Sequence, residues 1–144
     1  MRRNLMLRTG LLLLTLIGVF YLAFGALYVS VGDYLFFHKA ALPAGSEAGF
    51  RPLYLGLMKL IGGASIALGG LGLLILHTSV RARHALSLGG LAAAWAAPLV
   101  VAGYVAETLR RETGAPTSAN LMAILLAVLV AGAALRAFSG SGGK

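Results

Sequence analysis

Four long stretches without a charged side chain constrain this chain more than any other feature. Asp, Glu, Lys and Arg are absent from residues 9–32, 60–80, 84–106 and 113–135, which are 24, 21, 23 and 23 residues long. A helix rises about 1.5 Å per residue, so about 20 residues cross a hydrocarbon layer of about 30 Å. Each stretch therefore predicts one helix that spans a membrane.

The overall composition supports the same interpretation. Of the 144 residues, 59% are hydrophobic and 11% are charged, and the mean hydropathy is +0.89. Soluble domains carry about 25% charged residues, so this chain lacks the polar side chains that a water-exposed surface needs. Four spans and their connections use the whole length, which leaves no room for a separate soluble domain.

The net charge of +8 raises the question of nucleic-acid binding. The basic residues lie at the ends of the apolar stretches and form no continuous face, so we expect no nucleic-acid partner. The chain has no cysteine, which excludes disulfides, thiolate nucleophiles and cysteine-ligated metals.

The apolar stretches predict an all-α fold: an antiparallel up-down four-helix transmembrane bundle that forms one membrane domain, residues 1–138. We place the helices at 10–31, 53–76, 85–106 and 119–138, followed by a flexible tail at 139–144. Pro52 lies at the expected entry to the second helix, where its missing N–H costs no hydrogen bond. The first apolar stretch is longer than the core of a signal peptide, so we expect it to be retained.

Basic residues are distributed unevenly between the two ends of the predicted bundle. The end with both termini carries Arg2, Arg3, Arg8, Arg81, Arg83, Arg136 and Lys144. The other end carries four bases, Lys39, Arg51, Arg110 and Arg111, and all four acids, Asp33, Glu47, Glu107 and Glu112. Cytoplasmic loops of membrane proteins carry the excess of Lys and Arg, so both termini are predicted to be cytoplasmic.

Small residues recur at helical spacing on the first two predicted helices. In lipid, small residues let helix backbones approach closely, and dispersion then holds the helices together. We therefore predict helix packing through Gly18, Gly25, Gly62, Ser65, Gly69 and Gly72. The alternatives are that these residues open space for a ligand or make contacts in a homodimer. An adjacent stripe on the second helix consists of Lys59, Gly63, Ala67 and Gly70.

Lys59 is the one lysine inside a predicted span, about 9–10 Å deep at 1.5 Å per residue. A charge at depth is costly and normally pairs or faces a cavity, so we expect Lys59 to face other helices. Glu107 is its expected partner and Asp33 the second choice, with the hydroxyls of Tyr28 and Tyr104 at similar depth. These five residues form the predicted ligand-binding cluster. The alternative is that the flexible lysine simply extends to the headgroups.

Catalytic chemistry is not visible in the sequence. Nucleophile-elbow, zinc-protease, phosphate-loop and dinucleotide-binding motifs are all absent. The three histidines, His38, His77 and His84, are predicted to lie at the membrane interfaces, and a metal needs three or four ligands in one place. We therefore predict no catalytic residue, no metal site and no cofactor.

The connection at 32–52 is the longest one and holds Tyr34, Phe36, Phe37 and Phe50. Aromatic residues gather at membrane interfaces, so these side chains predict an interfacial belt. The other interpretation is a lid over a cavity between the helices, and the sequence does not separate the two.

Two segments, LYLGLMKLIGGASIALG at 53–69 and TGAPTS at 113–118 before the last helix, give the chain a familiar order of features. The layout resembles small four-helix bacterial membrane proteins of the DoxX-like kind. The resemblance implies a compact up-down fold in the bacterial inner membrane. Some DoxX-like proteins are linked to quinone or thiosulfate redox chemistry as membrane subunits. No residue here matches a redox motif, so the resemblance assigns no site.

Three functions fit these observations. The first is a non-enzymatic accessory or structural subunit of a membrane complex, whose partners are the lipid bilayer and other membrane subunits or a second copy. The second is a carrier for a small molecule or lipid, with a cavity lined by the predicted polar cluster. The third is a quinone-handling redox subunit that uses the same cluster. We favour the first, a protein that is not an enzyme.

Overall fold

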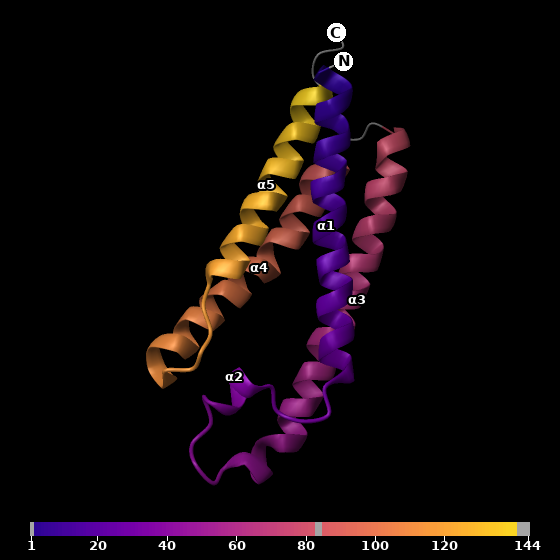
Figure 1. Ribbon diagram of the computed structural model, residues 1–144. Helices are drawn as coiled ribbons and strands as arrows, with labels where there is room; N and C mark the ends of the chain where they lie inside the picture. Colours follow the sequence, from indigo (N-terminus) through magenta and orange to yellow (C-terminus); the bar gives the residue numbers. More distant parts are fainter. Residues whose placement is uncertain (1, 83–84, 141–144) are drawn as a thin grey trace.

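The computed structural model describes residues 2–82 and 85–140, and every element in these two segments is helical (Figure 1). The helices are α1 (Arg2–Ser30), α2 (Phe36–Lys39), α3 (Glu47–Ala82), α4 (Ala85–Thr113) and α5 (Asn120–Gly140). Helix α2 is a single turn within the connection between α1 and α3. The predicted all-α fold is confirmed.

Four of these helices are long and apolar enough to cross a membrane. The candidate spans are Arg3–Ser30, Glu47–Thr78, Leu88–Thr113 and Asn120–Ser139. Each of them carries large apolar residues that are more than half exposed, for example Leu12, Leu60, Val101 and Ile124. Hydrocarbon accepts such an exterior because the helices satisfy their own backbone hydrogen bonds.

The helices extend beyond the bounds expected from the sequence. Helix α1 begins at Arg2 instead of residue 10, α3 runs from Glu47 to Ala82 instead of 53–76, and α4 continues to Thr113 instead of 106. The expected bounds followed the charge-free stretches, whereas backbone hydrogen bonding continues through charged turns outside the hydrocarbon. Pro52 consequently lies inside the second turn of α3 and not at its entry.

Two further sequence assignments concern the ends of the described segments. Helix α5 continues to Gly140, so the first residues of the expected tail are helical. Arg83 and Lys144, which the sequence assigns to the end with both termini, lie outside the described residues.

Helices α1 and α3 run antiparallel with their backbones in near contact. A Cβ atom on Gly25 would lie 2.6 Å from the carbonyl oxygen of Gly62, and one on Gly69 would lie 2.9 Å from the carbonyl oxygen of Gly18. Ser65 is buried on the same face of α3. Close backbone approach of this kind is what small residues permit inside a membrane.

The hydrophobic core lies where all four long helices meet. Leu14 and Ile17 of α1, Trp95 of α4 and Leu129 of α5 are fully buried there. The indole of Trp95 lies against Gly72 of α3, where a Cβ atom would collide with the ring. Its Nε1–H donates to the carbonyl oxygen of Leu68, 3.2 Å away, which ties α4 to α3.

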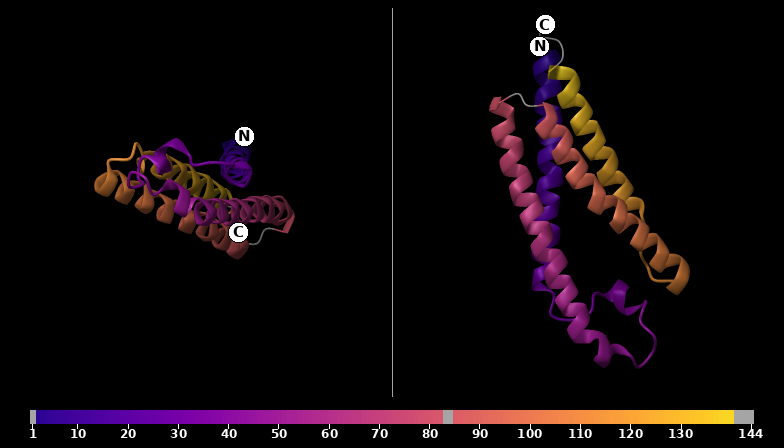
Figure 2. Two further views of the ribbon diagram at one scale, coloured as in Figure 1. Left: turned by 90° about the horizontal axis from the view of Figure 1, so that it is seen from below. Right: turned by 180° about the vertical axis from the view of Figure 1, so that it is seen from behind.

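The two ends of the molecule differ. The beginning of α1 and the end of α5 lie side by side at one end, called here the termini end (Figure 1). At the opposite end, the loop end, the α1–α3 pair and the α4–α5 pair lean apart (Figure 2). There Tyr28 and Met58 are buried within the first pair, while Gly103 packs on Met122 within the second.

Candidate functional site

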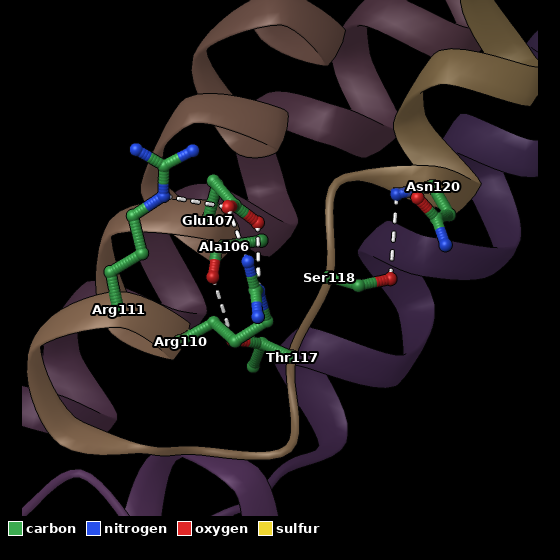
Figure 3. A network of polar contacts seen from close by, with 7 residues as sticks. All are labelled: Ala106, Glu107, Arg110, Arg111, Thr117, Ser118 and Asn120. Atoms are coloured by element: carbon green, nitrogen blue, oxygen red, sulfur yellow. Dashed lines mark hydrogen bonds and ion pairs between the residues drawn. The ribbon is translucent and has the colours of Figure 1, made fainter.

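Glu107 is the centre of a polar network on α4 (Figure 3). Its carboxylate accepts hydrogen bonds from Arg110 Nε at 2.9 Å, Arg110 Nη2 at 2.6 Å and Arg111 Nε at 2.7 Å. The arginines follow at i+3 and i+4, the spacing at which helix side chains meet. That spacing is visible in the sequence, although the sequence analysis assigned Glu107 to Lys59.

The chain reverses direction next to this network. Thr117 donates its hydroxyl to the carbonyl oxygen of Ala106 at 2.7 Å, and the N–H of Asn120 donates to Ser118 Oγ at 3.4 Å at the start of α5 (Figure 3). Gly114 takes a φ of +68°, a left-handed conformation that suits glycine at a helix end. These contacts hold α5 against α4 beside Glu107.

A shallow open depression of about 320 Å³ lies on the α4–α5 pair. Its lining is Gly103, Tyr104, Glu107, Thr108, Arg111 and Ala119. The depression thus unites Tyr104 and Glu107, two members of the predicted ligand-binding cluster. The Tyr104 side chain is 72% exposed, so this surface is open and not enclosed.

The predicted ion pair of Lys59 does not form. Within residues 2–82 and 85–140, the ion pairs join Lys39 to Glu47, Arg51 to Asp33, and Arg110 and Arg111 to Glu107. Both expected partners of Lys59 are therefore occupied by arginines. The reason is proximity: Glu107 meets two guanidiniums on its own helix, and Asp33 meets Arg51, which precedes Lys59 by eight residues on α3.

Lys59 instead lies on an exposed face of α3. The Lys59 stripe, defined as Lys59, Gly63, Ala67 and Gly70, is exposed along its whole length. A Cβ atom on Gly63 or Gly70 would meet no atom within 4 Å. The expectation that Lys59 faces other helices of this bundle is wrong, because α1 and α4 contact the neighbouring face, about 100° around the helix.

The loop end holds a second polar region that the sequence analysis did not assemble. Arg51 Nη2 donates to the carbonyl oxygen of Gly32 at 3.1 Å, and Arg51 Nε lies 3.6 Å from Asp33. The Tyr34 hydroxyl donates to the carbonyl oxygen of Glu47 at 2.6 Å. These bonds fasten the connection between α1 and α3 onto the beginning of α3.

His38 and Tyr54 form the centre of that connection. The Tyr54 hydroxyl accepts the N–H of Leu35 at 3.0 Å and lies 2.9 Å from His38 Nδ1. The hydroxyl and Nδ1 share a hydrogen bond whose direction depends on the tautomer of the imidazole. The sequence analysis treated His38 as an isolated interfacial residue, because its partner lies 16 positions away in α3.

Aromatic rings surround this pair. The Tyr28 ring centroid lies 6.5 Å from that of His38, Phe37 packs 4.4 Å from His38, and Tyr34 packs 4.6 Å from Tyr54. Tyr28, a member of the predicted cluster, therefore belongs to the His38 surroundings and not to a site with Glu107. Desolvation by these neighbours lowers the pKa of His38 from its ordinary value of 6.5.

The five predicted cluster residues thus occupy four separate places. Tyr104 and Glu107 share the α4–α5 depression, Asp33 joins Arg51, Tyr28 lies beside His38, and Lys59 is exposed on α3. Their role in binding a ligand stays a prediction. In the described segments no three His, Asp or Glu side chains lie close enough to share a metal ion.

Comparison with known proteins adds no identification: no protein-family model, no curated protein and no solved structure matches this chain. The resemblance to DoxX-like proteins stays a prediction. The functional argument therefore depends on the surfaces of the molecule itself.

Proposed function

We propose that this chain is a multi-pass membrane protein that acts as a non-enzymatic subunit of a membrane complex. In this proposal the Lys59 stripe of α3 receives a membrane-spanning helix of another protein. The observation that carries the proposal is the exposure of a small-residue face that also bears a charge.

Helix α3 has two faces of small residues, and only one is used within this chain. The face with Gly62 and Gly69 contacts α1 at backbone distance. The Lys59 stripe has the same kind of composition, yet Gly63 and Gly70 meet nothing within 4 Å. Small residues in a membrane let another helix approach closely, whereas they offer little contact area to lipid chains.

The charge of Lys59 defines the chemistry of the partner. A lysine within a span is costly unless it pairs, and its candidate partners in this chain, Asp33 and Glu107, are both engaged. A second copy of this chain would place Lys59 near Lys59, and like charges oppose association. The partner is therefore a different protein whose span carries an Asp or Glu at the depth of Lys59.

Site-specific photocrosslinking in the native membrane tests this proposal. A photoreactive phenylalanine analogue replaces Leu71, which is 61% exposed beside Gly70, or Ile124 of α5, which is 61% exposed and serves as the control. We expect a crosslink from position 71 to one membrane-spanning peptide with a carboxylate, identified by mass spectrometry, and no such crosslink from position 124.

Variants of the stripe then separate a specific contact from chance proximity. Gly63→Leu should reduce the crosslink about tenfold, since the bulky side chain keeps the partner helix away while meeting no atom of its own chain. Lys59→Glu should abolish the crosslink, and a lysine in place of the partner's carboxylate should restore it. A crosslink that survives Gly63→Leu, or one that joins two copies of this chain, would refute the proposal.

A further inference from the structure

The depression on the α4–α5 pair crosses the level at which α4 leaves the apolar part of its span. The charge-free stretch of this helix ends at residue 106. Tyr104 precedes that boundary, and Glu107 and Arg111 follow it. Tyr104 and Arg111 are seven residues apart, which is about 10 Å along the helix axis. The depression is therefore apolar at one end and polar at the other.

Small residues form the floor of the depression. Gly103 is buried, and a Cβ atom on it would lie 3.3 Å from Met122 Cβ and 3.9 Å from Ala119 Cβ. The bond from the Thr117 hydroxyl to the carbonyl oxygen of Ala106 holds the chain against α4 just before α5 begins. Backbone packing therefore fixes the position of this floor.

The polar end of the depression carries more positive charge than negative. Glu107 accepts two hydrogen bonds from Arg110, at 2.9 and 2.6 Å, so Arg110 already balances the carboxylate. Arg111 adds one bond through Nε at 2.7 Å, and its two Nη atoms point away from Glu107 (Figure 3). Within residues 2–82 and 85–140 these Nη atoms make no hydrogen bond, and the Arg111 side chain is 72% exposed. Its donors are therefore open to a ligand.

Phosphate is the ligand that these donors fit. The planar guanidinium of arginine donates parallel hydrogen bonds to phosphate oxygens. A phosphodiester carries one negative charge, which matches the excess positive charge of Arg110 and Arg111 over Glu107. Glu112 lies about 100° around α4 from Arg111 and does not line the depression.

The apolar end indicates the phosphate of a lipid and not a free one. Tyr104 is 72% exposed. Val100 and Val101, four and three residues before it, continue the same surface into the span and are 55% and 60% exposed. An acyl chain can cover these side chains while its headgroup lies at Arg111, whereas a free phosphate would gain nothing from them.

We infer that the α4–α5 depression is a binding site for a phospholipid. Arg111 donates to the phosphodiester, and Tyr104 contacts the adjoining acyl chain. Glu107 is a positioning residue, because it holds the Arg111 guanidinium at the edge of the depression. The site is independent of the Lys59 stripe, since it involves neither α3 nor a protein partner.

Lipid retention by the full chain in neutral detergent tests this inference. The protein is mixed with dioleoylphosphatidylglycerol or with dioleoylglycerol, which has the same acyl chains without the phosphate. After gel filtration, the retained lipid is extracted and measured by mass spectrometry. Hydrogen bonds to charged groups are the stronger kind, so we expect about tenfold more phospholipid than dioleoylglycerol. Arg111→Gln should retain the two lipids equally.

Matched variants separate this site from general charge and from loss of folding. Arg51→Gln removes one positive charge at the same end, from an arginine that also pairs with a carboxylate, and should keep the whole difference. In Arg111→Gln the Glu107 carboxylate keeps both bonds to Arg110, so the unfolding midpoint should change little. Tyr104→Ala, at an exposed position, should lower phospholipid retention about threefold, because the acyl chain loses an apolar contact.

Several results would overturn the inference. Equal retention of the two lipids by the unmodified protein would exclude a phosphate contact. An undiminished difference in Arg111→Gln, or an equal decrease in Arg51→Gln, would place the phosphate elsewhere on the molecule. Unchanged phospholipid retention in Tyr104→Ala would exclude the depression. Displacement of the phospholipid by millimolar inorganic phosphate would show that the acyl chain contributes nothing and that the site binds free phosphate.

Discussion

Neighbouring glycines of α3 have opposite surroundings, although they are alike in sequence. A Cβ atom on Gly62 would lie 2.7 Å from the carbonyl oxygen of Gly25 and 2.7 Å from the backbone nitrogen of Val29. A Cβ atom on Gly63 would meet nothing within 4 Å. Gly62 therefore sets the distance between two helices, while Gly63 only leaves a surface open.

Gly62→Ala should destabilise the protein by about 1–3 kcal/mol, since the added methyl group forces two backbones apart. Gly63→Ala should leave the stability equal or raise it by up to about 1 kcal/mol, because alanine favours the helix more than glycine does. Reversible unfolding in mixed micelles measures both. Equal effects of the two substitutions would contradict the close α1–α3 contact.

Tyr21 offers a second comparison at the residue scale. Its hydroxyl donates to the carbonyl oxygen of Trp95 at 2.5 Å, and the two rings stack with centroids 6.4 Å apart. Tyr21→Phe should cost about 0.6 kcal/mol and at most about 1.7 kcal/mol, the range for hydrogen bonds between membrane helices. The control is Tyr104→Phe, whose ring is 72% exposed and whose loss of a hydroxyl should leave stability unchanged.

The same pair of variants has an optical readout. Trp95 is the only tryptophan of the chain, so intrinsic fluorescence reports on its surroundings alone. Tyr21→Phe should shift the emission, whereas Tyr104→Phe should not. If both variants emit like the unmodified protein and unfold identically, the hydrogen bond to Trp95 has no energetic role.

At the scale of elements, the stability of the connection with α2 depends on the protonation of His38. The Tyr54 hydroxyl accepts the N–H of Leu35 and shares with His38 Nδ1 a hydrogen bond whose direction depends on the tautomer of the imidazole. A protonated imidazole can only donate at Nδ1, and its charge would be desolvated among the surrounding rings. The groups around His38 are the Tyr28 ring of α1, Phe37 of α2 and Tyr54 of α3. None of them is a carboxylate that would favour the charged form.

The lowered pKa of His38 determines the direction of the pH effect. Below pH 6.5 the opened connection binds more protons than the closed one, so closure is most stable above pH 6.5 and weakens as the pH falls toward the lowered value. Amide hydrogen exchange should show the protection factor of the Leu35 N–H decreasing over this range. His38→Gln should remove the dependence, and His77→Gln should preserve it; the reverse pattern would assign the effect to another group.

At the scale of the whole molecule, the fold consists of two antiparallel pairs that share a core at one end and lean apart at the other (Figure 2). Charges follow this division: the acids lie at the loop end, whereas Arg3, Arg8 and Arg136 lie at the termini end. In a membrane, the arginine-rich end is expected on the cytoplasmic side.

Single cysteines test this orientation cleanly, because the natural chain has none. Asn4→Cys lies at the exposed beginning of α1 and Ala44→Cys in the exposed loop before α3. In intact cells whose outer layer admits the reagent, a membrane-impermeant maleimide should label Ala44→Cys. It should label Asn4→Cys only after the membrane that holds the protein has been permeabilised. Labelling of Asn4→Cys in intact cells would reverse the orientation and leave the fold untouched.

The sequence was least informative about side-chain partners. Glu107 pairs with Arg110 and Arg111, a relation that the i+3 and i+4 spacing contains, but a longer-range pair with Lys59 was preferred. The bond between His38 and Tyr54 has no such local signal, because it joins α2 to α3 across a turn of the chain. The helix that carries each residue was predictable, whereas the side of α3 on which Lys59 lies was not.

The sequence alone determined that the chain forms long helices suited to a lipid bilayer. Charge-free stretches of this length fit a hydrocarbon layer, where each backbone group must find its hydrogen-bond partner within the helix. Only the tertiary structure decided which stripe of α3 is covered. The faces of Gly62 and Gly63 are both rich in small residues, and the choice between them depends on how every helix packs against the others. Hydropathy and helix length are properties of a local stretch of residues, whereas the rotation of a helix about its axis depends on its packing against all its neighbours.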